Sequence, residues 1–375
     1  MDKRLAGGVL GLTGLIAAAW SAREVPAAMG RLPSGARAER MRKSPNYSGG
    51  VFRNPLATAT MPVNNSRRIL REFLFNGARR RPAAPIPLAE PGPPSQSGLH
   101  ITWYGHASAL VELDGQRVLI DPIWSERCSP SQQVGPRRLH PPPLPLSALP
   151  PVDAVLISHD HYDHLDMATI QELVRSQDAV FAVPLGVGSH LDRWGVPEDR
   201  ITELDWDESL TVGELTLTAA AARHFSGRAF TRNGSQWASW VIAGPAGKVF
   251  YTGDSGYFPG YADLGERYGP FDAALVQTGA YDPAWPDIHM FPEEAVSAHQ
   301  AVRGGLLIPV HWATFDLALH TWADPVDRLC REAGERGVPI CVPRPGQRID
   351  VAAPPAPDGW WQALARYPNS TVAID

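Results

Sequence analysis

The sequence predicts an α/β fold in which two β-sheets pack against each other and helices cover their outer faces. From Leu99 onward, short apolar runs bounded by turn residues indicate strands, and these outnumber the stretches with helical spacing. A hairpin-like pair joined at residues 244–247, together with single helices between groups of strands, fits such a layered arrangement. The 375 residues, of which 44% are hydrophobic, can build one large catalytic domain or two ordinary ones.

The individual elements follow from the spacing of apolar residues along the chain. We expect strands at residues 101–104, 109–113, 117–120, 154–157, 215–219, 240–243, 248–251, 273–276 and 306–310. Helical spacing is found at residues 168–174 and 293–302. The catalytic domain is therefore assigned to residues 99–348, and residues 349–375 are expected to form a C-terminal tail.

The first 22 residues resemble a signal peptide or an anchor. Lys3 and Arg4 precede an apolar run at residues 5–20, which has the length of a signal-peptide core and is shorter than a full membrane span. The basic residues that follow oppose translocation of this run. The sequence thus leaves two locations open, a membrane-associated or cell-envelope one and a cytoplasmic one.

Residues 23–98 are rich in Arg, Pro, Ala and Gly and are expected to form an arm or linker. Six prolines between residues 82 and 94 prevent regular helix or sheet pairing there. Residues 69–75 form an amphipathic stretch whose aromatic face is expected to cover the core rather than to touch a membrane.

Charge and cysteine content exclude several classes of function. The formal net charge of −5 comes without a long basic run in the second half of the chain, so nucleic acid is not an expected partner. Cys128, Cys330 and Cys341 are odd in number and widely spaced, which argues against both a disulfide framework and a cysteine metal site. We interpret these cysteines as structural.

A dense group of polar residues follows the buried strand expected at residues 154–157. The six residues from His159 to His164 have the sequence HDHYDH and lie between this strand and the next helical stretch. Loops at strand ends present side chains from a rigid scaffold, and imidazole and carboxylate are ligands of zinc and related divalent ions. Three histidines and Asp163 in one such loop indicate a metal site.

Three further candidate ligands stand at the ends of later strands. His224, Asp254 and His311 each follow an apolar run, at residues 217–222, 250–251 and 307–310 respectively. Each residue alone is compatible with an ordinary loop or turn. Together with the first group they make a complete set for two metal ions.

The segment from His159 to His164 matches the HxHxDH signature of the metallo-β-lactamase superfamily, which the chain resembles. The resemblance implies a four-layer αββα fold and two metal ions, zinc by expectation. It also implies which residues hold them: His159, His161 and His224 the first ion, Asp163, His164 and His311 the second, with Asp254 bridging both.

Additional motifs narrow the resemblance to the N-acyl phosphatidylethanolamine phospholipase D family and its bacterial relatives. They are WYGHAS at residues 103–108, LIDP at 119–122, GPRR at 135–138, GAY at 279–281, PEEA at 292–295 and PVHWATF at 309–315. The resemblance covers residues 45–348 and is looser to the ascorbate-6-phosphate lactonase branch. It implies cleavage of N-acyl phosphatidylethanolamine to N-acylethanolamine and phosphatidic acid, with a membrane surface and a second copy of the chain as expected partners.

The chemistry expected of such a centre does not require a serine or cysteine nucleophile. Two divalent ions share a hydroxide that attacks the substrate, and they neutralise the charge that develops on oxygen. Asp163 and Asp254 are therefore the expected catalytic carboxylates. The proton donor to the leaving group stays open among four candidates, Asp160, Tyr162, His289 and His320, of which the last three are also the expected substrate-binding residues. Asp121 and Asp166 are expected to orient the ligand imidazoles.

Several alternatives share the same fold or the same site. A two-zinc centre also opens lactones, cleaves soluble phosphodiesters and attacks β-lactam rings, and an apolar groove beside the metals would favour a lipid over these. In the di-iron oxidoreductase branch a Glu commonly replaces the second histidine of the signature, whereas this chain has His161 there. A metal-free scaffold is the least favoured alternative, because every expected ligand is present.

Overall fold

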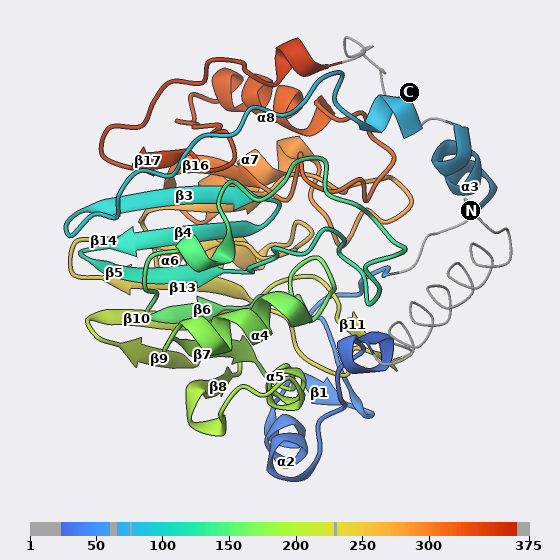
Figure 1. The fold of residues 1–375 in the computed structure, drawn as a ribbon, viewed down its shortest axis with the longest axis vertical. Helices are drawn as coiled ribbons and strands as arrows, with labels where there is room; N and C mark the ends of the chain where they lie inside the picture. Colours follow the sequence, from blue (N-terminus) through green and yellow to red (C-terminus); the bar gives the residue numbers. More distant parts are fainter. Residues whose placement is uncertain (1–23, 61–65, 76, 229–230, 366–375) are drawn as a thin grey trace, which may run out of the picture.

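The computed structural model describes residues 24–60, 66–75, 77–228 and 231–365, so the signal-like segment 1–22 lies outside the described residues. The core of the protein consists of two β-sheets (Figure 1). One has seven strands in the order β17-β3-β4-β5-β6-β7-β8, and the other has six strands in the order β16-β15-β14-β13-β10-β9. The first sheet contains β3 (Leu99–Gly105), β4 (Ser108–Leu113), β5 (Gln116–Ile120), β6 (Ala154–Leu156), β7 (Val180–Pro184), β8 (Ile201–Leu204) and β17 (Arg348–Asp350). The second contains β9 (Ser209–Val212), β10 (Leu215–Ala220), β13 (Ser239–Gly244), β14 (Gly247–Tyr251), β15 (Phe271–Gln277) and β16 (Gly304–Val310).

Helices cover the outer face of each sheet and complete four layers. The seven-stranded sheet packs against α4 (Met167–Ser176) and α5 (Gly188–Arg193), and the six-stranded sheet against α6 (Gly260–Arg267), α7 (Pro292–Ala301) and α8 (Asp324–Glu335). Between the sheets, apolar side chains from both inner faces form one buried cluster. The predicted αββα sandwich is therefore confirmed, and the expected strands and helices of residues 99–310 are all present.

Short elements fill the connections. They are β1 (Tyr47–Ser48), β2 (Val51–Phe52), β11 (Gly227–Arg228), β12 (Thr231–Arg232) and the 3₁₀ turns Gly77–Arg80, Leu146–Ala148, Glu198–Arg200 and Gln362–Leu364. In each large sheet the pairing changes from antiparallel to parallel, at β5–β6 in one and at β14–β15 in the other. The parallel strands end at the same edge of their sheet, which is where their connecting loops gather.

The arm at residues 23–98 is more regular than the sequence indicated. It contains α2 (Gly35–Lys43), the β1–β2 hairpin and α3 (Ser66–Phe75), because the prolines that interrupt regular structure lie C-terminal to these elements. Met41 and Phe52 are buried against residues of the catalytic domain. The expectation that the aromatic face of residues 69–75 covers the core is wrong for Phe75, which is 77% exposed.

The expected C-terminal tail also belongs partly to the sheet. β17 pairs with β3 across the predicted boundary at residue 349, and Trp360 and Trp361 are buried in the central cluster. A boundary placed at residue 349 therefore divides a strand and leaves out two core residues. Across the described ranges, every helix is too short or too polar to span a membrane.

The three cysteines are unpaired. Burial raises the pKa of Cys330 to about 12 and that of Cys341 to about 11, and it raises the pKa of the Cys128 thiol well above its usual value. All three are thiols at neutral pH, which makes them poor nucleophiles.

Candidate metal centre

The predicted ligands converge because each follows a strand that ends at the same side of the sandwich. The segment from His159 to His164 lies between β6 and α4, while His224, Asp254 and His311 follow β10, β14 and β16. The backbone before Asp254 approaches its neighbours closely: a Cβ on Gly253, whose φ is +57°, would lie 2.6 Å from the Ala238 carbonyl oxygen. Only glycine fits there without displacing the loop.

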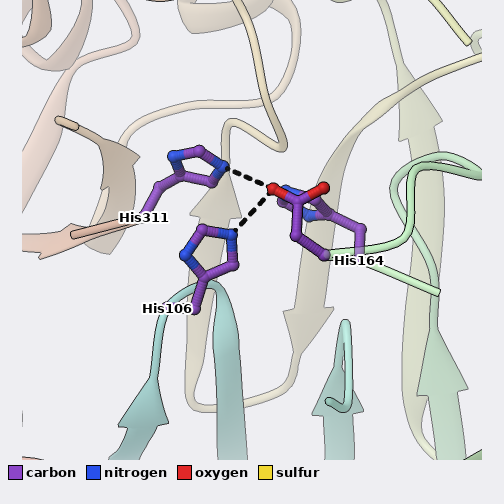
Figure 2. Close-up of side chains that lie close together, drawn as sticks. His106, His164 and His311 are labelled. Carbon is purple, nitrogen blue, oxygen red and sulfur yellow. Dashed lines mark hydrogen bonds and ion pairs between the residues drawn. The ribbon is translucent and has the colours of Figure 1, made fainter. Parts of the chain in front are cut away.

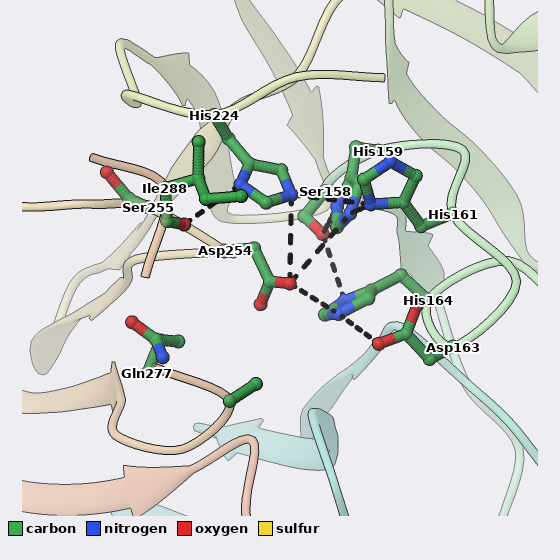
Figure 3. Close-up of polar contacts among 12 residues, drawn as sticks. Ser158, His159, His161, Asp163, His164, His224, Asp254, Ser255, Gln277 and Ile288 are labelled. Carbon is green, nitrogen blue, oxygen red and sulfur yellow. Dashed lines mark hydrogen bonds and ion pairs between the residues drawn. The ribbon is translucent and has the colours of Figure 1, made fainter. Parts of the chain in front are cut away.

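Three imidazoles form the first group of potential ligands (Figure 3). His159 Nε2 lies 2.8 Å from His161 Nδ1, and His224 Nε2 lies 3.3 Å from the same atom. His224 Nδ1 lies 3.0 Å from the Ile288 carbonyl oxygen. Because a carbonyl only accepts, Nδ1 carries the proton and Nε2 presents a lone pair toward the other two rings.

The second group consists of Asp163, His164 and His311. Figure 2 shows His311 and His106 directed toward one carboxylate oxygen, which is Asp163 Oδ2, at 3.4 Å and 3.0 Å respectively. His164 Nε2 lies 3.6 Å from the same oxygen, while its Nδ1 donates to Asp121 Oδ2 at 2.7 Å. Asp121 thus orients this imidazole, as predicted.

Asp254 lies between the two groups. Its Oδ2 is 3.0 Å from His311 Nε2 and 3.2 Å from His164 Nε2 on one side, and 3.8 Å from His224 Nε2 and 4.0 Å from His159 Nε2 on the other. No other carboxylate among the described ligands touches both groups, so Asp254 has the position expected of a bridging ligand.

Both central carboxylates are held in the ionised form. Burial opposes the ionisation of Asp254, but His164 and His311 outweigh it and hold its pKa well below the usual range. For Asp163 the same opposition by burial is overcome by His164 and by the neighbouring His106 and His311, so its pKa is also well below normal.

The imidazoles divide into two protonation classes in the metal-free protein. Burial, reinforced by neighbouring histidines, lowers the pKa of His159 and of His224 well below the usual value, although Asp254 acts in the opposite direction. Burial also disfavours the charged form of His164 and His311, but Asp254 and Asp163 outweigh it and raise both pKa values. A cation entering the site would displace the protons on these two rings.

Unpartnered buried atoms show that the residues fit metal ions. His164 Nε2, His311 Nε2 and Asp254 Oδ1 are buried without a hydrogen-bond partner, a condition that costs free energy unless another group satisfies them. The potential ligand atoms within each of four overlapping groups lie within 4.8 Å of one another. Imidazole nitrogen and carboxylate oxygen in such numbers suit zinc and iron rather than magnesium or calcium.

His106 is the one member of this cluster to which the sequence analysis assigned no role. Burial, reinforced by His311, lowers its pKa to about 3, so it is neutral and its Nε2 donates to Asp163 Oδ2 at 3.0 Å. Its backbone N–H donates to Thr314 Oγ1 at 2.6 Å. The signal that could have found it is the one that found the other ligands, a histidine directly after a strand.

The predicted substrate residues are placed differently from one another. His289 lies beside the ligands, with ring centroids 5.3 Å from both His224 and His311. His320 lines a neighbouring pocket and accepts the Ala280 N–H at Nε2. Tyr162 stacks against Arg228 and lines a different pocket, so its role toward the substrate stays a prediction.

Two acidic residues also have roles other than those expected. Asp160 accepts hydrogen bonds from the Gly227 N–H and the Ser235 hydroxyl, both at 2.7 Å. Asp166 accepts the backbone N–H of Ser125 at 3.0 Å and the hydroxyl of Thr169 instead of orienting an imidazole. These hydrogen-bond partners fix the directions of the two side chains. Because the partners lie outside the loop, the spacing of residues within the loop does not predict those directions.

A pocket of about 190 Å³ opens onto the ligands. Its lining includes the ligands His161, Asp163, Asp254 and His311, the neighbouring His289, and apolar side chains from Phe225, Ala280, Trp285, Ile288 and Leu317. Among the described residues that line it, none is Lys or Arg. Its walls are therefore suited to an uncharged or apolar group next to the metal ligands.

The network behind His106 predicts a loss of stability in acid. His140 is buried, and its Nε2 lies 3.0 Å from Thr314 Oγ1. Burial, with help from Arg138, lowers its pKa from 6.5 to about 4. Between these values the unfolded chain binds a proton that the folded chain excludes, so the free energy of unfolding decreases as the pH falls below about 6.5.

Urea unfolding at pH 7 and pH 5 measures this contribution. A His140→Gln variant is expected to show a smaller decrease between the two pH values than the unsubstituted protein, by about 2 kcal/mol. The same decrease in both proteins would show that His140 does not titrate differently in the folded state.

Comparison with known proteins agrees with this geometry. Residues 116–312 match the β-lactamase superfamily domain. An uncharacterized protein of Mycobacterium tuberculosis is 51% identical over 362 residues, covering 94% of this chain and 97% of that protein. The N-acyl-phosphatidylethanolamine-hydrolyzing phospholipase D 1 of Caenorhabditis elegans is 35% identical over 248 residues, covering 63% of this chain and 70% of that protein.

A solved structure supports the fold independently. The isothiocyanate hydrolase from Delia radicum gut bacteria superposes with a TM-score of 0.54 at 20% identity, covering 67% of this chain and 98% of that one. At this identity the likeness concerns the fold alone. From the matched domain, the relatives and the arrangement of ligands, the chain belongs to the metallo-β-lactamase superfamily and is a metal-dependent hydrolase.

Proposed function

We propose that the chain is a two-zinc phosphodiesterase of the phospholipase D type, which hydrolyses N-acyl phosphatidylethanolamine to N-acylethanolamine and phosphatidic acid. The observation that carries this proposal is the apolar-walled pocket at the metal ligands, which lacks Lys and Arg among its described lining residues. A small soluble phosphodiester would be better served by a cationic pocket. The similarity to the Caenorhabditis elegans phospholipase D gives independent support.

The ligands are proposed to divide as the geometry groups them. His159, His161 and His224 would hold one ion, Asp163, His164 and His311 the other, and Asp254 both. Two such ions supply Lewis acidity and lower the pKa of coordinated water, which makes water a nucleophile at neutral pH.

The chain's own residues supply orientation and proton handling. His106 fixes Asp163 Oδ2 through its Nε2–H, and Asp121 fixes the His164 ring through Nδ1. His289 has a buried Nδ1 without a hydrogen-bond partner and lines the pocket. Burial lowers the pKa of His289 to about 3, so of the four candidates it is the one we propose to donate a hydrogen bond, as a neutral imidazole, to the leaving oxygen.

We further propose that the chain acts at a membrane surface and forms a homodimer. A phospholipid substrate implies contact with a membrane surface, and the family resemblance suggests a homodimer. Arg67 and Arg71 are exposed on the same helix, α3, as the exposed Phe75, a combination that suits an anionic lipid surface.

Metal content and lipid turnover together test the proposed function. The purified protein is analysed for zinc and iron per chain and incubated with vesicles containing N-acyl phosphatidylethanolamine. Two zinc ions and release of N-acylethanolamine are expected. Two metals without lipid turnover would contradict the substrate and leave lactones and soluble phosphodiesters, and two iron ions would contradict the choice of zinc.

The wall of the pocket provides a test of lipid specificity. Trp285→Leu is expected to lower kcat/KM for the phospholipid about 10- to 100-fold, because burying the indole against an acyl group contributes about 1.5–3 kcal/mol. Turnover of methyl 4-nitrophenyl phosphate, which lacks acyl chains, should change little.

Trp206→Leu is the matched control for this experiment. Both indoles are half-buried and donate Nε1–H to a backbone carbonyl, at 2.8 Å in Trp285 and 2.7 Å in Trp206, but Trp206 lies outside the pocket lining. An equal loss on both substrates in Trp285→Leu would indicate a damaged site rather than a lost acyl contact.

A further inference from the structure

Arg228 joins the two ends of the metal-binding loop, which comprises residues 157–166 between β6 and α4. This residue of β11 is buried, with 4% of its surface exposed, and its Nη1 donates to the carbonyl oxygens of Asp160 and Leu165 at 2.7 Å and 2.8 Å. The segment between these carbonyls contains His161, Asp163 and His164. One guanidinium nitrogen therefore sets the distance across the part of the loop that carries three proposed ligands.

The other guanidinium nitrogens hold the N-terminal arm. Nε and Nη2 donate to the carbonyl oxygen of Ala28 at 3.1 Å and 2.8 Å. The guanidinium also lies over the ring of Tyr162 at 4.1 Å and that of Trp194 at 5.0 Å. A planar group with donors in fixed directions can satisfy three carbonyls and two rings at once, and a lysine ammonium cannot.

A second contact brings the same arm against the same loop. The backbone N–H of Arg31 donates to His190 Nδ1 at 3.1 Å, and His190 Nε2 lies 3.4 Å from Asp160 Oδ2. Gly30 lets the arm approach this closely, since a Cβ there would lie 2.0 Å from His190 Nδ1. Residues 28–31 thus contact the metal-binding loop through two independent side chains.

We propose that Arg228 is a positioning residue of the metal centre and that it couples docking of residues 28–31 to metal affinity. The proposal rests on the metal centre described under the proposed function, but not on its substrate. Coupling between two binding events is reciprocal. Docking of the arm therefore strengthens metal binding by the same factor by which bound metal strengthens docking of the arm.

Arg228→Lys and Arg200→Lys in the full chain test this role. Arg200 is a matched control, because its guanidinium also donates to three backbone carbonyls, those of Ala179, Val174 and Gln177, and lies over the Phe181 ring, but it contacts no part of the metal-binding loop. We measure the affinity for zinc by competition with a chromogenic chelator, the melting temperature, and the rate of trypsin cleavage after Arg31 with and without zinc.

Arg228→Lys is expected to weaken zinc binding about 10- to 100-fold, the range typical of residues that orient metal ligands. Zinc should slow trypsin cleavage after Arg31 in the unsubstituted protein and not in this variant. Arg200→Lys is expected to lower the melting temperature while zinc affinity changes less than about twofold. Equal zinc affinity in the two variants would overturn the proposal.

Gly30→Ala tests the coupling from the side of the arm and serves if Arg228→Lys does not fold. Its methyl group would lie 2.0 Å from His190 Nδ1, so residues 28–31 and His190 could not keep their present contact. Faster cleavage after Arg31 together with weaker zinc binding is expected, and faster cleavage with unchanged zinc binding would contradict the coupling. Failure of the proposed metal centre itself would be visible separately, as an unsubstituted protein that binds no zinc.

Discussion

Replacing Asp254 with alanine is expected to lower kcat/KM by at least about 10³-fold and to reduce the metal content of the chain. Its Oδ2 is the only carboxylate oxygen among the described ligand atoms that lies within 4.0 Å of histidine nitrogens from both groups. Without it, the negative charge that draws cations to the centre is reduced. Metal ions contribute several kcal/mol to transition-state stabilisation, and each 1.36 kcal/mol is a factor of ten in rate.

The measurement combines metal analysis with hydrolysis by the same preparation. Asp178→Ala is the control, because Asp178 is an exposed aspartate in the loop before β7. It should retain metal and activity. An Asp254→Ala protein with two metals and near-normal turnover would refute the bridging role.

Asp121→Asn is expected to destabilise the protein by about 3–5 kcal/mol and to weaken metal binding about 10- to 100-fold. The buried carboxylate accepts the Ser158 N–H at Oδ1, at 2.7 Å, and at Oδ2 the hydroxyls of Ser158 and Tyr251 and the His164 Nδ1–H, at 2.6, 2.5 and 2.7 Å. An amide has one acceptor oxygen, so whichever way it turns, its NH₂ group faces at least one donor.

Urea unfolding and zinc titration measure the two effects separately. Asp153→Asn provides the comparison. In the described structure, Asp153 Oδ2 accepts one hydrogen bond, from the Arg117 N–H, and an amide oxygen can still accept it. This control should lose no more than about 1 kcal/mol. If Asp121→Asn behaved like Asp153→Asn, the Asp121 carboxylate would not be orienting His164.

The ligand set could be predicted because metal ligands at strand ends can be recognised in the sequence, as His or Asp residues that follow an apolar run. A buried strand followed by imidazoles and carboxylates predicted the positions of His159, His224, Asp254 and His311, and the structure brings these residues together. Their assignment to individual metal ions stays a prediction. His106 also follows a strand directly, but it lies in a two-residue turn between β3 and β4 and outside the HxHxDH signature. The sequence analysis therefore assigned it no role.

Side-chain direction within loops could not be predicted in the same way. Tyr162 lies between two proposed ligands in sequence, yet its ring turns toward Arg228. Arg228 lies 66 positions further along the chain, so no local periodicity predicts the direction of the Tyr162 ring. The packing of the arm could not be predicted for a related reason, since Met41 and Phe52 contact apolar partners in the catalytic domain rather than in neighbouring sequence.

The centre draws on both sheets. The loop after β6 belongs to the seven-stranded sheet, whereas His224, Asp254 and His311 follow strands of the six-stranded one. In the proposed division of the ligands, the first ion would need residues of both sheets up to Asp254 and the second would need them up to His311, so neither group is complete before the two sheets pack together. Because ligands that bind only the native state stabilise it by mass action, metal binding at this centre would also stabilise the packing of the two sheets against each other.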